Sequence, residues 1–280
     1  MSTIGIVGAG EVGGAVAHAL ARRDRVSRVV LVDEARGVAA GKALDIQQSG
    51  AVEGFHARLE GTDDASRLIG CDVCVLADAA RQGEWSGEAG LALVRRLLGQ
   101  IGTAPIVAAC AGAAPLIALV ARETGLARER IVGSAPEALA AAARSLVALE
   151  AGCSPAEVGL TVLGTPPSGW VVPWIEASIG GHALERVLSQ AQVVRVESRL
   201  ARIWPPGPFA LGLAGALVAE AIVTASRRTF AVLGWLDGEM GVRGRVGVVP
   251  VLLSASGIVH RRAPELSGRD RVRLGTALGA

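Results

Sequence analysis

Three glycines near the start of the sequence, Gly8, Gly10 and Gly13, have the spacing of a turn that binds phosphate groups. They lie between a short apolar segment and an Ala-rich segment, so we expect a strand, a turn and a helix. Gly8 permits the tight turn, Gly10 lets the backbone approach a pyrophosphate, and Gly13 lets the helix pack against the strand. The free N–H groups at the helix start, where Glu11 and Val12 lie, together with the helix dipole, favour a bound anion.

A carboxylate follows the second apolar segment, where Asp33 comes directly after RVVLV, 20 residues beyond Gly13. A carboxylate at that point accepts hydrogen bonds from both ribose hydroxyls of a dinucleotide and repels a 2′-phosphate. The sequence therefore predicts an NAD site, with NAD favoured over NADP. The alternative is a glycine turn kept for packing alone, since binding can be lost while a fold persists.

Elements of two kinds must position these residues. Apolar strands alternate with helices over the first part of the chain, which predicts βαβ units and a parallel sheet. Beyond Ser134 we expect a helix over 138–152, short β segments, helices over 185–204 and 211–233, an antiparallel meander over 239–259 and a C-terminal helix over 264–278. The predicted fold is α/β, with a doubly wound parallel-sheet (Rossmann) domain over 1–134 and a mixed α+β domain over 135–280.

Composition narrows the classes of partner and location. The formal net charge is only +2 and no Lys/Arg block interrupts the chain, so nucleic acid is not expected as a partner. The strand pattern begins within three residues, which leaves no room for a signal peptide. The uncharged run over 97–121 contains Pro105 and Pro115 and fits a buried strand and helix better than a membrane span. We expect a cytoplasmic protein that makes no membrane contact.

The sequence offers one cysteine pair with the spacing of a metal or redox motif, Cys71 and Cys74. They stand at the start of an apolar strand, without a second pair or a neighbouring His. We therefore expect buried core thiols and no metal site.

The sequence resembles the NAD-dependent lactate/malate dehydrogenase family, and most of all its bacterial malate dehydrogenases. The first domain is similar in IGIVGAGEVGGAVAHALA, VLVDEARGVAAGKALDIQQSGAVEGF and GTDDASRLIGCDVCVLAD, and the closing meander in LDGEMGVRGRVGVVPVLLSASGIV. ERIVGS and ALEAGCSPAEVGLTVLG match the middle without a gap. The resemblance implies the family's fold, an NAD cofactor and hydride transfer between nicotinamide and a 2-hydroxy acid.

That reaction needs a His to take the hydroxyl proton, an Asp to orient the His, and an Arg to grip the substrate carboxylate. The resemblance assigns the His position to Pro166, or to Pro167 if the register shifts by one. It assigns the Asp position to Leu139 and the Arg position to Ala142. None of these side chains transfers a proton or carries a charge.

The resemblance also implies changes around the cofactor. The lid segment AARQGEWSGEAG retains one family arginine as Arg81, whereas Gly87 replaces the second. Ala109 falls where an Asn would hold the nicotinamide ribose, and Pro206 where the far wall carries a small polar residue. Asp78 replaces a small apolar residue beside the cofactor, and we expect its charge to repel the pyrophosphate.

No other residue restores the lost chemistry in the sequence. We expect His18, His56, His182 and His260 to be surface or structural residues. Glu84 on the lid is expected to be solvated, Glu137 has no predicted place, and Trp85 and Trp170 could fill the emptied pocket.

Three functions remain open from the sequence. The first is a non-catalytic paralogue that binds NAD and associates with itself or with an active relative. The second is an active but divergent NAD-dependent dehydrogenase of the 2-hydroxy acid type. The third is a scaffold subunit that binds no nucleotide. GKALDIQQSG resembles the helix at the family's dimer interface, which favours an oligomer.

Overall fold

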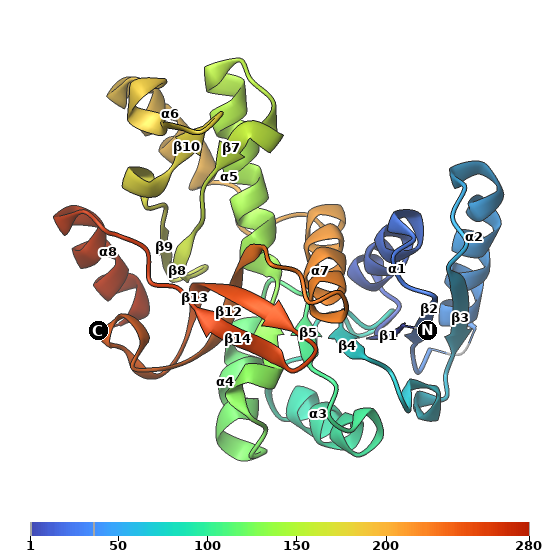
Figure 1. Ribbon diagram of the computed structural model, residues 1–280. Helices are drawn as coiled ribbons and strands as arrows, with labels where there is room; N and C mark the ends of the chain where they lie inside the picture. The colour runs from blue at the N-terminus through green and yellow to red at the C-terminus, as the bar shows by residue number, and fades with distance from the viewer. Residues whose placement is uncertain (1, 36, 280) are drawn as a thin grey trace.

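The first half of the chain folds as alternating strands and helices in the computed structural model, which describes residues 2–35 and 37–279 (Figure 1). The elements are β1 (Thr3–Val7), α1 (Glu11–Arg23), β2 (Arg28–Val32), α2 (Val38–Glu53), β3 (Arg58–Thr62), β4 (Val73–Leu76), α3 (Gly87–Ile101), β5 (Ile106–Ala108), α4 (Ala113–Glu123) and β6 (Ile131–Gly133). Their strands are all parallel, as predicted.

The sheet has the order β3-β2-β1-β4-β5-β6 in its parallel part. The chain runs outward from β1 to β3 and then returns to place β4 on the other side of β1. In such sheets ligands bind at the carboxyl edge of the strands where the order reverses. The turn after β1 and the residues after β4 therefore lie at the expected ligand edge.

Antiparallel strands extend the same sheet beyond β6. They are β12 (Thr229–Asp237), β13 (Arg243–Ser254), β8 (Leu163–Thr165) and β9 (Gly169–Val171), with β14 (Gly257–Arg261) paired to β13. Leu233 of β12 pairs with Gly133 of β6, so hydrogen bonding is continuous across the predicted boundary at 134. The division into domains 1–134 and 135–280 stays a prediction.

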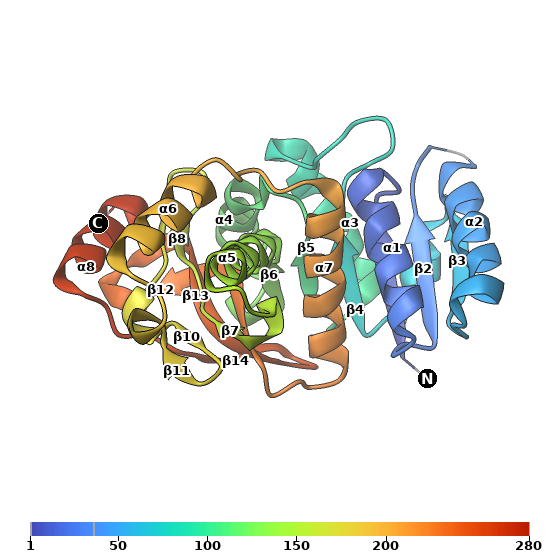
Figure 2. The same cartoon turned by 90° about the horizontal axis from the view of Figure 1, so that it is seen from above.

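The remaining elements form a lobe and a cover for the sheet. They are α5 (Ala135–Ala151), β7 (Val158–Gly159), β10 (Ser178–Ile179), β11 (His182–Ala183), α6 (Gln190–Leu200), α7 (Pro208–Val223) and α8 (Gly268–Leu278). Helix α7 lies beside α1, as Figure 2 shows, and the two share an apolar cluster that contains Val16, Leu20 and Val218. No helix within the described residues is long and apolar enough to cross a bilayer.

Two of the predicted helices were wrong in their extent. The helix expected over 211–233 ends at Val223, and β12 begins at Thr229. In a continuous apolar run, a buried helix and a buried strand show no difference in hydrophobic period. The predicted helix was therefore extended through the turn after Val223 into the next strand. The helix expected over 185–204 covers only Gln190–Leu200, because Ser189 and Gln192 form a capping box that fixes its start.

Candidate functional site

The glycine turn lies between β1 and α1, and close contacts require its glycines. Gly8 has a φ of +107°, which L side chains rarely adopt. A Cβ on Gly13 would collide with the Gly8 carbonyl. Lys42, the only lysine of the sequence, donates to the Gly10 carbonyl at 2.6 Å and holds the turn against α2.

The anion position of this turn is occupied by the Asp78 side chain, which comes just after β4. Its Oδ2 accepts from the Glu11 N–H at 2.9 Å and its Oδ1 from the Gly13 N–H at 3.0 Å. The Gly10 N–H donates to the Asp78 backbone carbonyl at 2.8 Å, and a Cβ on Gly10 would collide with the carboxylate. The N–H groups predicted to bind a pyrophosphate therefore bind this carboxylate. Sequence reasoning expected repulsion from Asp78 but not its capture by the turn.

Asp33 lies at the end of β2 as predicted, but it is only 6 % exposed. Its Oδ2 accepts from the N–H groups of Ala9 at 2.7 Å and Ala80 at 2.9 Å, and its Oδ1 accepts from Ala35 at 2.8 Å. A carboxylate has about four acceptor positions. One position is thus left for a ribose hydroxyl, where the sequence suggested two.

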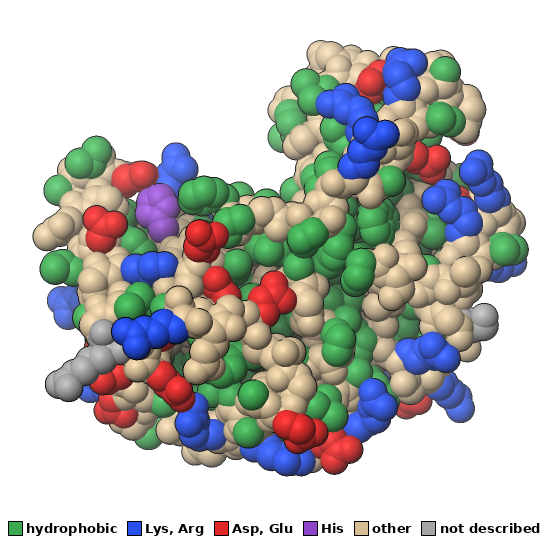
Figure 3. Space-filling view, turned by 180° about the vertical axis from the view of Figure 1, so that it is seen from behind, with side chains coloured by type: hydrophobic (Ala, Val, Ile, Leu, Met, Phe, Trp, Pro, Cys, Tyr) green, Lys and Arg blue, Asp and Glu red, His purple; other side chains and the backbone are tan. Residues whose placement is uncertain are grey.

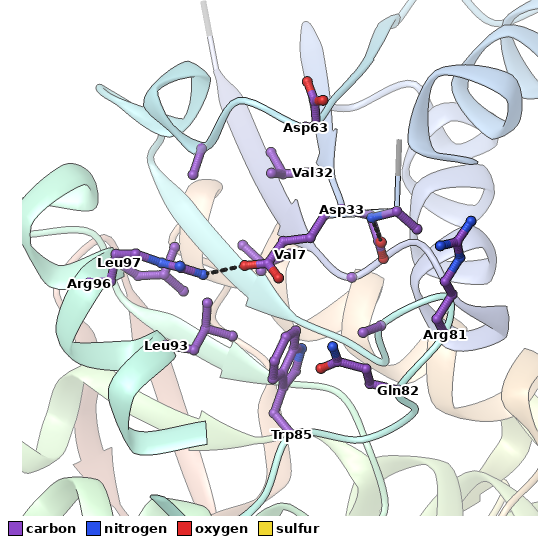
Figure 4. Close-up of a pocket in the computed structure, with 15 residues that line it drawn as sticks. Val7, Val32, Asp33, Asp63, Arg81, Gln82, Trp85, Leu93, Arg96 and Leu97 are labelled. Atoms are coloured by element: carbon purple, nitrogen blue, oxygen red, sulfur yellow. Dashed lines mark hydrogen bonds and ion pairs between the residues drawn. The ribbon is translucent and has the colours of Figure 1, made fainter. Parts of the chain in front are cut away.

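A cavity of about 380 Å³ is lined by Asp33, by Gly8 of the turn and by Ala79, the residue after Asp78 (Figure 4). Its walls combine apolar side chains with carboxylates and two arginines: Val7, Val32, Asp33, Glu34, Asp63, Arg81, Trp85, Leu93, Arg96 and Leu97. In Figure 4, Trp85 and Gln82 enter from the lid side, whereas Val32 and Asp63 lie opposite. The size and the apolar walls suit the adenosine part of a dinucleotide.

The lid lies over this edge of the sheet and is attached at both ends. Ala79 and Gly83 exchange backbone hydrogen bonds of 2.8 and 3.1 Å. Glu84 accepts from the Gly112 N–H at 2.9 Å, at the start of α4. Glu84 is exposed, as expected, but it also binds the N–H group before α4, which the sequence does not show because it does not reveal which helix end the lid reaches. Arg81 is exposed at the rim, and Gly87 begins α3 with a φ of +53°.

The thiols near the site are not reactive groups. Cys71, Cys74 and Cys110 are buried, as predicted for the first two. Burial raises the pKa of Cys71 to about 11 and raises the pKa of Cys74 further. Burial also raises the pKa of Cys110, and the charges of Glu84 and Asp78 add to this effect. The Glu84 and Asp78 carboxylates therefore both lie near Cys110, which follows β5. Within the described residues, no group of three or more potential ligands could hold a metal ion.

The positions that the resemblance assigns to catalysis lie in or next to β8, α5 and β5. Pro166 follows β8 and is buried, Leu139 is fully buried in α5, and Ala142 is half-buried one turn further along that helix. Ala109 is fully buried at the end of β5, where Gly215 of α7 packs closely against it. From behind, Figure 3 shows mostly apolar side chains in the hollow between the lobe that carries α6 and the rest of the molecule.

Glu137 lies two residues before Leu139 in α5 and is buried, but its carboxylate binds groups elsewhere in the fold. It binds Arg144 at 2.7 Å and accepts from the Ala231 N–H of β12 at 2.9 Å. This carboxylate therefore joins α5 to the sheet. It does not replace an orienting carboxylate at Leu139.

The histidines and tryptophans have structural surroundings. His56 pairs with Asp24 at 2.9 Å and His18 lies 3.7 Å from Glu53, while His182 and His260 are exposed. The ring of Trp170 lies 6.4 Å from that of Trp204, centroid to centroid. Trp85 lines the adenosine-sized cavity, which is not the place of a lost catalytic side chain.

An NAD cofactor fits this site only in part. The glycine turn, the Asp33 position and the cavity suit the adenosine half. The pyrophosphate does not fit while Asp78 holds the N–H groups of Glu11 and Gly13.

Comparison with known proteins places these features in context. Residues 2–115 match the family model of the lactate/malate dehydrogenase NAD binding domain. A malate dehydrogenase of Thioalkalivibrio sulfidiphilus is 30 % identical over 276 residues, which cover 92 % of this chain and 90 % of the relative. One of Salinibacter ruber is 27 % identical over 291 residues, which cover 98 % and 93 %.

Solved structures show the same α/β fold. The malate dehydrogenase of Salinibacter ruber superimposes with a TM-score of 0.88 at 24 % identity, covering 99 % of this chain and 94 % of the other. The lactate dehydrogenase of Cryptosporidium parvum, in complex with lactic acid and NAD, gives a TM-score of 0.87 at 22 % identity, covering 99 % and 95 %.

Proposed function

Because the chain belongs to the lactate/malate dehydrogenase family, we propose that it is a non-catalytic paralogue, which keeps the NAD-binding domain but not the hydride-transfer chemistry. The proposal rests on Pro166, Leu139 and Ala142, which the resemblance assigns to the positions of the proton carrier, its orienting carboxylate and the carboxylate clamp. The burial of Leu139 and of Pro166 supports it, since neither place admits a charged replacement without cost.

The expected loss of rate is large. General acid–base catalysis contributes about 10²–10⁴-fold. A hydrogen bond to a charged group adds about 1.5–3 kcal/mol, and a bidentate clamp makes two of them. We therefore expect steady-state reduction of oxaloacetate and of pyruvate by NADH at least about 10⁴-fold slower than for an active malate dehydrogenase assayed alongside. A rate within about tenfold of that control would refute the proposal.

One observation favours a second candidate, a scaffold subunit that has lost nucleotide binding. The capture of Asp78 by the glycine turn removes the donors that a phosphate would need. The family match to an NAD binding domain favours the first candidate.

We also propose that the chain forms an oligomer with itself or with an active paralogue, in the cytoplasm. Phe209, at the start of α7, is 84 % exposed and lines a groove with Ala15, Lys42 and Ile46 of α1 and α2. An exposed aromatic side chain over a groove is typical of a subunit contact.

The Phe209→Glu variant tests this contact, because a charge there would have to be buried on association. We expect sedimentation to show a dimer or larger assembly for the natural chain and monomers for the variant. Val272→Glu is the matched control, since Val272 is 72 % exposed on α8, and its mass should equal that of the natural chain. A natural chain that sediments as a monomer at micromolar concentration would contradict self-association and leave only assembly with an active paralogue.

A further inference from the structure

The glycine turn already binds an anion, the Asp78 carboxylate. The negative charge of this carboxylate outweighs the attraction of the α1 N-terminus for a phosphate. The N-terminus of a helix carries about half a positive charge. The Asp78 carboxylate brings a full negative charge onto the N–H groups of Glu11 and Gly13, and Glu11 adds another carboxylate in the first turn of α1. A phosphate at this place would find its donors occupied and would meet net repulsion.

The neighbouring cavity is also acidic. Asp33, Glu34 and Asp63 line it, and only Glu34 has an arginine partner among the described residues that form its wall, Arg96 at 2.7 Å. Figure 4 shows Arg96 on one side of the cavity and Arg81 on the other. Such walls favour a ligand with hydroxyl groups or a positive charge over a ligand with a phosphate.

The apolar part of the cavity favours a flat heterocycle. Val7, Val32, Leu93 and Leu97 supply its surface. The indole Nε1 of Trp85 is buried and has no hydrogen-bond partner within the described part of the chain. A buried donor of this kind is costly unless an acceptor meets it. This atom has no accessible surface, so a ligand in the cavity does not reach it. The apolar side chains, and not this donor, therefore carry the preference for a heterocycle.

From these features we propose that the cavity binds an unphosphorylated nucleoside-type ligand, and that Asp78 excludes the phosphorylated counterparts. The heterocycle packs against the apolar side chains, and the sugar hydroxyls donate to the carboxylates. Asp78 is thus the residue that sets ligand specificity at the turn. The inference goes beyond the proposed lack of turnover and does not depend on it.

Calorimetric titration of the purified full-length chain with adenosine, ADP and NAD tests the proposal. The natural chain should bind adenosine at least as tightly as ADP. In Asp78→Ala the freed N–H groups should raise the affinity for ADP at least about tenfold, while the affinity for adenosine changes less than about threefold. Asp78→Asn removes the charge but keeps an acceptor in the turn, so its gain for ADP should be smaller. Trp85→Phe removes the inaccessible Nε1 donor but keeps an aromatic ring in the wall, so adenosine binding should change less than about twofold.

The contrary results are equally specific. A natural chain that prefers ADP or NAD over adenosine by about tenfold overturns the proposal. So does the absence of adenosine binding at millimolar concentration, or an unchanged affinity for ADP in a folded Asp78→Ala protein. If Asp78→Ala does not fold, Asp78→Asn takes its place in the comparison. None of these outcomes bears on oxaloacetate turnover, so failure here leaves the proposed function intact.

Discussion

Leu139→Asp is expected to lose about 4 kcal/mol or more of unfolding free energy, enough to unfold much of the chain. Leu139 is 0 % exposed and belongs to an apolar cluster with Leu233 and Val248. An aspartate at this position in an active enzyme would have an imidazole to pair with, and here that position is Pro166. An unpaired carboxylate in such surroundings has neither counter-charge nor water. Urea unfolding followed by circular dichroism measures the loss.

Ala142→Asp is the matched control for this prediction. It places the same side chain on the same helix at a half-buried position, so we expect a change within about 1 kcal/mol. If Leu139→Asp were as stable as this control, the α5 position would be open to water or to an unrecognised cation. The interpretation of a sealed apolar site would then be wrong.

Pro166→His is expected to leave oxaloacetate and pyruvate reduction undetectable, although it supplies an imidazole at the predicted proton-transfer position. Leu139 offers that imidazole no carboxylate to orient it, and Ala142 offers the substrate no guanidinium. Groups that act as a unit in catalysis are strongly non-additive, so one restored member gives little. We expect a gain below about tenfold in kcat/KM, against the 10⁴-fold or so that is missing.

Two further variants serve as comparisons for Pro166→His. Ala142→Arg alone should also be inactive, while the combination Pro166→His with Ala142→Arg should exceed either single variant if the clamp and the base act together. Full recovery by Pro166→His alone would show that the base position was assigned correctly but that another residue already grips the substrate. Such recovery would also require a new assignment for the orienting carboxylate.

The sequence predicted the parallel sheet, the glycine turn and the burial of Cys71 and Cys74, because each depends on local pattern and spacing. It did not predict that Asp78 binds the turn, since that contact joins residues 65 and 67 positions apart in the chain. The sequence also did not predict that the Asp33 carboxylate accepts a hydrogen bond from the N–H of Ala80, which follows a different strand, β4. The direction of a side chain at a crowded sheet edge depends on tertiary packing, and the sequence pattern of one strand does not predict it.

The contacts of Glu84 and Glu137 could not be predicted from the sequence for the same reason. Each carboxylate finds a backbone N–H in an element distant in sequence, Gly112 for Glu84 and Ala231 for Glu137. Charge alone predicts solvent for such residues. Glu84 does stay exposed, whereas Glu137 is buried, and only the assembled fold supplies the donors that each of them binds.

A single-turnover experiment tests most directly the claim that the reaction chamber lacks its proton carrier and its anion grip. The chain, produced in a host without malate or lactate dehydrogenase, is held in excess over NADH and mixed with saturating oxaloacetate or pyruvate. We predict no oxidation of NADH above the enzyme-free rate in the natural chain. We predict none in Asp78→Ala either, at an NADH concentration at which calorimetry shows that this variant binds the cofactor, because no group positions or protonates the keto acid. Oxidation of the NADH in one phase, with malate or lactate formed in equal amount, would contradict the account.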